Sequence, residues 1–113
     1  MKIAFDYDGT ISEDLEGWLA VMRMMKERGH EVFVVTFRDE RHDVNDDLEF
    51  IFDEDFDIYW TRGVAKRWWC EQFGPGKVDV WIDDKPEAII NNSNYTVGDL
   101  HVWREGCKNA ASA

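Results

Sequence analysis

Short apolar runs alternate with helical patterns along almost the whole chain, and this alternation limits the possible folds more than any other feature. The apolar runs that read as buried strands cover residues 2–5, 31–35, 56–60, 78–82 and 100–103. Strands that alternate with helices form parallel sheets, because each helix carries the chain back across the sheet. The sequence therefore predicts an α/β fold, a three-layer Rossmann-like sandwich with a mainly parallel sheet of five strands.

Four helices are expected between the strands. Ser12 is the predicted N-cap of the first helix, which covers residues 13–28 and ends at Gly29. The second helix places four apolar residues on one face, namely Val44, Leu48, Ile51 and Phe52. Thr61 is the predicted cap of the third, which runs to about residue 73, and a short fourth helix covers 86–90.

The chain is the size of one domain. Its 113 residues are enough for one core, and we expect a single domain over 1–104 followed by a flexible tail over 105–113. No apolar stretch approaches the roughly 18 to 20 residues of a membrane span, and Met1 leads straight into the first apolar run. The two cysteines, Cys70 and Cys107, have no metal-site spacing. We therefore expect a cytoplasmic protein with reduced thiols.

The net charge restricts the partners. With 24 acidic against 13 basic residues, the charge is −11, whereas binding along a nucleic-acid groove relies on Lys and Arg. We expect no long-groove nucleic-acid binding. A small phosphorylated ligand or a polynucleotide end remains compatible if a metal ion offsets the repulsion.

The stretch FDYDGT places two carboxylates, Asp6 and Asp8, directly after the first predicted strand. A calcium loop of the EF-hand type would need an oxygen ligand at its fifth position and glycine at its sixth. Thr10 and Ile11 stand there instead. The pair must therefore be interpreted together with the residues that lie near it in the fold.

Other polar residues follow the neighbouring strands. Ligands of parallel sheets bind beyond the carboxyl ends of the strands. Thr36 follows the second strand, the pair Asp83 and Asp84 follows the fourth, and Lys66 lies early in the helix after the third. Lys85 lies at the same edge and is the alternative to Lys66.

The order of these motifs closely resembles the haloacid dehalogenase superfamily of aspartate-dependent phosphohydrolases. The matching motifs are DYDGT, VVT, the lysine Lys66 and WIDDKPEA, and they span residues 2 to about 90. The resemblance implies an enzyme, a Mg²⁺-dependent phosphatase that hydrolyses a phosphomonoester through an aspartyl phosphate. Nucleotides and phosphorylated nucleic-acid ends are among the candidate substrates.

The resemblance also implies the role of each residue. Asp6 is the expected nucleophile, and Asp8 the group that protonates the leaving oxygen and then activates water. Mg²⁺ is expected on Asp6, the main-chain carbonyl of Asp8 and the pair Asp83 and Asp84, with Asp84 favoured as the direct ligand. Thr36 and Lys66 would hold the phosphoryl oxygens. The candidates for further phosphate or substrate contacts are Gly9, Thr10, Arg38 and Lys85.

Members of this superfamily often carry a cap domain, and this chain leaves no room for one. A capless site is open, so bulky phosphorylated substrates or a homo-oligomeric partner that acts as a lid are both compatible. Three alternatives stay open: a phosphotransferase, a catalytically silent phosphate-binding or adaptor protein, and a response-regulator receiver domain. The last fits least, because its motifs follow the strands in another order.

Overall fold

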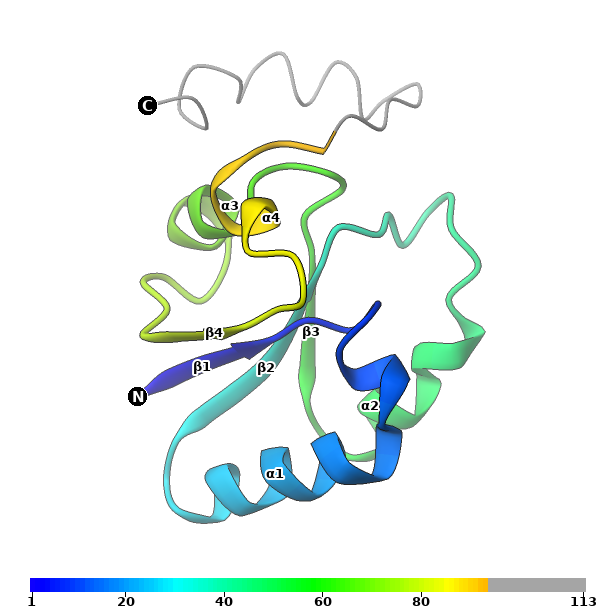
Figure 1. The fold of residues 1–113 in the computed structure, drawn as a ribbon, viewed down its shortest axis with the longest axis vertical. Helices are drawn as coiled ribbons and strands as arrows, with labels where there is room; N and C mark the ends of the chain where they lie inside the picture. The colour runs from blue at the N-terminus through cyan, green and yellow to red at the C-terminus, as the bar shows by residue number, and fades with distance from the viewer. Residues whose placement is uncertain (94–113) are drawn as a thin grey trace.

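The computed structural model describes residues 1–93, and its centre is a sheet of four parallel strands (Figure 1). The strands are β1 (Lys2–Phe5), β2 (Glu31–Thr36), β3 (Asp57–Trp60) and β4 (Val80–Ile82), in the spatial order β3-β2-β1-β4. The predicted α/β class and parallel sheet are confirmed for these four strands. The expected fifth strand at 100–103 and the tail at 105–113 lie outside the described residues.

Helical segments join the strands and lie on both sides of the sheet (Figure 1). They are the 3₁₀ turns η1 (Ile11–Glu13) and η2 (Asp46–Leu48) and the α-helices α1 (Leu15–Glu27), α2 (Glu49–Asp53), α3 (Lys66–Phe73) and α4 (Glu87–Ile90). None of the helices within residues 1–93 has the length and apolar character that crossing a membrane requires.

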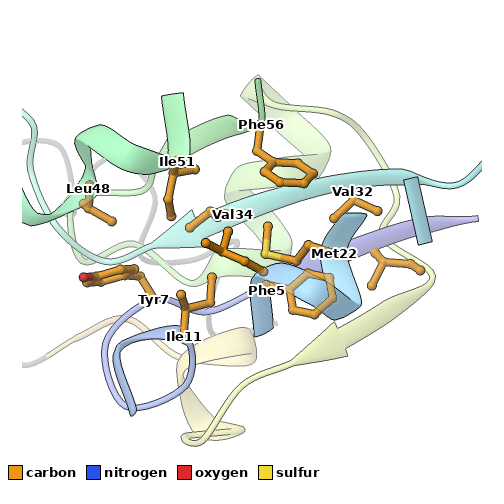
Figure 2. Packing of buried hydrophobic residues seen from close by; sticks show 11 residues of the cluster. Phe5, Tyr7, Ile11, Met22, Val32, Val34, Leu48, Ile51 and Phe56 are labelled. Atoms are coloured by element: carbon orange, nitrogen blue, oxygen red, sulfur yellow. The ribbon is translucent and has the colours of Figure 1, made fainter. Parts of the chain in front are cut away.

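One face of the sheet packs against α1 and α2 (Figure 2). Strand residues that alternate along β1 and β2, such as Phe5 and Val34, meet Met22 of α1 and Ile51 of α2 there, and all four are buried. Full burial of such a side chain stabilises the fold by about 1.5 to 3 kcal/mol. This face thus holds the larger part of the core and fixes the position of β1.

The opposite face packs against α3. Ala4, Phe33 and Val35 point to this side, one position out of phase with the residues of the first face. Cys70 of α3 is fully buried against them. Because β1 and β2 are buried on both faces, they read in the sequence as continuous apolar runs rather than as alternating patterns.

The first helix begins later than the sequence predicts. The side chain of Asp14 accepts a hydrogen bond from the backbone N–H of Gly17, at 3.1 Å, and is the true N-cap of α1. The hydroxyl of Ser12 instead accepts from the backbone N–H of Gly9, at 3.0 Å. The prediction of Ser12 as the cap is wrong, because the turn after β1 uses that hydroxyl.

The second and third helices are shorter than predicted. Val44 and Phe52 are exposed, and only five residues of the expected second helix form α2. The third helix begins at Lys66 rather than directly after Thr61, because Arg62 and Gly63 have positive φ angles of 55° and 81°. Thr61 therefore caps no helix.

Candidate functional site

Asp6 lies at the carboxyl end of β1, the strand that has β2 on one side and β4 on the other. Its backbone N–H donates to the carbonyl of Ile82, at 2.9 Å, which continues the pairing with β4. The side chain is buried. The sheet thus brings Asp6 beside Asp83, the residue that follows Ile82, as the sequence predicts for parallel strands.

Lys66 joins this pair from the first turn of α3. Its ammonium group donates to Asp6 Oδ1 at 2.8 Å and to Asp83 Oδ2 at 2.6 Å, and its side chain is only 3% exposed. The ring of Phe37 lies 5.4 Å from the same nitrogen. Lys85, in contrast, is exposed, and its backbone N–H donates to Asp83. Of the two candidate lysines, the structure brings Lys66 to Asp6.

Asp6, Asp83 and Asp84 form a cluster of three carboxylates. Each offers an oxygen within 4.8 Å of the others, a separation that can hold one metal ion. The pKa of Asp6 is raised to about 7, chiefly because the carboxyl group is buried; Lys66 opposes this shift, and Asp84 and Asp83 add to it. Three carboxylates against one ammonium group leave a local surplus of negative charge, which a hard divalent cation with oxygen ligands would balance.

The turn after β1 fits closely around this cluster. Gly9 has a φ of 85°, and a Cβ atom at this position would collide with the carboxylate of Asp84. The hydroxyl of Thr10 donates to Asp6 Oδ2, at 3.3 Å, and accepts from the backbone N–H of Asp84, at 3.2 Å. Gly9 and Thr10 therefore shape the cluster, whereas the contacts that they would make with a phosphate stay a prediction.

Asp8 points to a different partner. Arg38, two residues beyond the end of β2, donates from Nε and Nη2 to the two carboxylate oxygens of Asp8, at 2.9 and 2.7 Å. The side chain of Asp8 is 54% exposed, in contrast to that of Asp6. The two acids of the FDYDGT stretch thus occupy different environments, one buried beside a lysine and one at the surface beside an arginine.

Thr36 ends β2 and is buried. Its hydroxyl accepts a hydrogen bond from the backbone N–H of Arg38, at 3.2 Å. Thr36 therefore lies at the expected edge and shapes the chain that leads to Arg38. Its expected contact with a phosphoryl oxygen stays a prediction.

Sequence reasoning missed two residues that hold Arg38. Asp47 accepts from Nη1 and Nη2 of Arg38 at 2.8 and 2.9 Å, and the ring of Tyr7 lies 5.1 Å from the guanidinium carbon. Asp47 stands in an acidic run with no pattern of its own. Tyr7 could have been singled out, since an aromatic residue between two acids at a strand end needs a packing partner, and its ring packs against Arg38.

A hollow of about 250 Å³ opens beside the carboxylate cluster. Residues from the turn after β1, from α1 and from the end of β4 line it, among them Trp18, Asp83 and Asp84. Asp84 is exposed, whereas the side chain of Asp83 is 3% exposed. Small molecules thus have access to the cluster from the Asp84 side.

No protein-family model, curated protein or solved structure matches this chain. The geometry of the site joins a buried carboxylate held by a lysine, a carboxylate cluster that could hold a cation, and a second, exposed acid two residues away.

Proposed function

We propose that the protein is a Mg²⁺-dependent phosphatase that hydrolyses a phosphomonoester through an aspartyl phosphate on Asp6. The observation that carries the proposal is the position of Asp6. Its buried carboxylate contacts Lys66 and belongs to the three-carboxylate cluster at the carboxyl edge of the sheet. This edge is where parallel sheets place their ligands.

The proposed reaction has two steps. In the first, a carboxylate oxygen of Asp6 attacks phosphorus, the bond from phosphorus to the leaving oxygen breaks, and Asp8 gives that oxygen a proton. In the second, Asp8 takes a proton from water and the water oxygen attacks phosphorus. The bond between phosphorus and the Asp6 oxygen breaks, which releases phosphate and restores the free carboxylate of Asp6. Lys66 supplies positive charge beside the attacking carboxylate throughout.

The residues present fit a magnesium ion. Asp6 and Asp84 would hold it, together with the main-chain carbonyl of Asp8, while Asp83 also holds Lys66. Magnesium prefers oxygen ligands, and when bound it would offset the repulsion between the Asp6 carboxylate and the phosphate dianion. Together, Mg²⁺ and the ammonium group of Lys66 would balance the charge of the three carboxylates.

The proposal includes three further features of the protein. These are membership of the haloacid dehalogenase superfamily, a fifth strand that completes a three-layer sandwich, and the absence of a cap domain. The short connections between strands support the absence of a cap domain. Only η1 and α1 lie between β1 and β2, and only α3 lies between β3 and β4. An open site suits phosphate at the end of a bulky substrate, such as a nucleotide or polynucleotide end.

Hydrolysis of a generic aryl phosphate tests the proposal. Activity should require Mg²⁺, stop with excess chelator and weaken in Ca²⁺, whose looser coordination misplaces the nucleophile. Asp6→Asn should abolish it, and Asp57→Asn, a change at an exposed acid of β3, should not. Undiminished hydrolysis in excess chelator would refute the mechanism. Binding of Mg²⁺ and phosphate with no turnover would instead support the silent phosphate-binding alternative.

A further inference from the structure

Arg38 lies between two carboxylates from different parts of the chain. Its Nε and Nη2 atoms contact both oxygens of Asp8, and its Nη1 and Nη2 atoms contact both oxygens of Asp47. Paired N–H···O bonds of this kind fix orientation as well as distance, because the guanidinium group is planar. The Asp8 carboxylate is thus oriented although its side chain is 54% exposed.

The guanidinium group is itself anchored. Nη1 donates to the carbonyl of Val44, at 3.1 Å, and the face of the group lies over the ring of Tyr7. The hydroxyl of Tyr7 donates to the carbonyl of Asp47, at 3.3 Å, so that ring and anchoring acid are also joined. Tyr7 lies at the same end of the core cluster as Leu48, the residue after Asp47 (Figure 2). The support of Arg38 therefore rests on the hydrophobic core.

We infer that Arg38 is a positioning residue that holds the carboxylate of Asp8 in the orientation that proton transfer needs. This inference rests on the proposed function and assigns Arg38 a task other than contact with substrate. Asp47, Tyr7 and the carbonyl of Val44 keep Arg38 in place. Arg38 acts through Asp8 and leaves the attack by Asp6 to Lys66 and the carboxylate cluster.

The two reaction steps depend on Asp8 to different degrees. An aryl phosphate has a good leaving group and barely needs a proton donor, so attack by Asp6 proceeds without help from Asp8. Hydrolysis of the aspartyl phosphate does need Asp8, because water must lose a proton. Misplacing a catalytic group by about 1 Å can cost up to about 100-fold in rate. Loss of Arg38 should therefore slow the second step alone.

Rapid mixing of the protein with an aryl phosphate and Mg²⁺ measures both steps. In Arg38→Ala, a fast burst of phenol should be followed by a steady state slower than wild type by up to about 100-fold. Arg38→Lys should not restore the rate, since an ammonium group cannot contact both oxygens in this way. Free guanidinium ion at millimolar concentration should restore part of it in Arg38→Ala. If Arg38 contributed only to stability, guanidinium ion would not restore the rate of Arg38→Ala.

Two further variants complete the experiment. Asp47→Ala removes one of the groups that hold Arg38 and should give a smaller loss of the same kind, so it tests the inference even if Arg38→Ala does not fold. Arg23→Ala removes a paired arginine–glutamate contact with Glu54, away from the site, and should leave both steps unchanged. The inference is wrong if wild type is active and the two variants, Arg38→Ala and Asp47→Ala, either slow both steps equally or slow neither. If wild type shows neither turnover nor adduct, the proposed function fails and the inference falls with it.

Discussion

The ammonium group of Lys66 lies 2.8 Å from a carboxylate oxygen of Asp6, although the two residues are 60 positions apart in the sequence. Both side chains are buried. A buried ion pair is weak evidence for stability, since both partners give up their hydration, but removal of one partner is costly because the other charge stays behind. The contact connects α3 to the end of β1 and keeps two opposite charges together in the protein interior.

Lys66→Met should destabilise the metal-free protein by about 3 to 5 kcal/mol, because the carboxylates of Asp6 and Asp83 lose their shared cation. Added Mg²⁺ should then raise the melting temperature of the variant more than that of wild type. Thermal unfolding with and without Mg²⁺ measures both effects. An equal or smaller increase in the variant would mean that Lys66 and the metal do not share these carboxylates.

Lys85→Met is the matched control for this prediction. Lys85 is exposed, so the change should leave the stability and the response to Mg²⁺ close to wild type. If Lys85→Met abolished aryl phosphate hydrolysis while Lys66→Met did not, the phosphate-binding lysine would have been assigned wrongly.

Gly9→Ala should impair both folding and metal binding. A φ of 85° costs a residue with a side chain about 1 to 2 kcal/mol, and the new Cβ would displace the carboxylate of Asp84. Gly29→Ala separates the two effects, since Gly29 has a φ of 91° and a Cβ there would meet nothing within 4 Å. Both variants should lose stability by urea unfolding, but only Gly9→Ala should lose stabilisation by Mg²⁺. A normal Mg²⁺ response in Gly9→Ala would contradict the placement of Asp84 in the metal site.

Asp39→Asn should reveal a pH-dependent contribution to stability outside the proposed site. Burial alone would raise the pKa of Asp39, but hydrogen bonds from Arg41 and the charges of Arg41 and Arg62 lower it below its ordinary value of 3.8. A lowered pKa stabilises the folded protein above pH 3.8, and this contribution is lost as the pH falls through the pKa of the folded state.

The Asn variant should therefore be less stable than wild type by about 1 to 3 kcal/mol near neutral pH, and the difference should shrink in acid. Urea unfolding at about pH 7 and about pH 3 measures it. The exposed Asp57→Asn change serves as the control. An equal difference at both pH values would show that Asp39 contributes through packing rather than through its charge.

The sequence predicted the four described strands and the meeting of their carboxyl ends for a simple reason. Parallel strands joined by helices end at the same edge, so Asp6 and Asp83 had to come close once the strands were recognised. Lys66 was placed at this edge correctly, although its helix begins later than expected. Its position depends on the edge of the sheet, not on the length of the helix.

Other parts of the site could not be predicted, because loops determine them. The contact between Arg38 and Asp47 depends on how the chain after β2 turns back, and no periodic pattern describes such a loop. The start of α3 was missed because Arg62 adopts a positive φ, which is uncommon for a residue with a side chain. Thr61 was mistaken for a cap because a hydroxyl residue that precedes a helix and one that follows a strand look alike in sequence.

In the proposed mechanism, Asp6 forms the covalent intermediate and Asp8 transfers protons. Intact-mass analysis after acid quench, with an aryl phosphate and Mg²⁺, distinguishes these two roles. Asp8→Asn should trap a phosphoryl adduct, because it keeps the nucleophile and loses general acid–base help worth roughly 10² to 10⁴ in rate, while Asp6→Asn should show no adduct and only background turnover. An adduct that maps to Asp8, Asp83 or Asp84, or turnover that neither change affects, would show that these roles do not belong to Asp6 and Asp8.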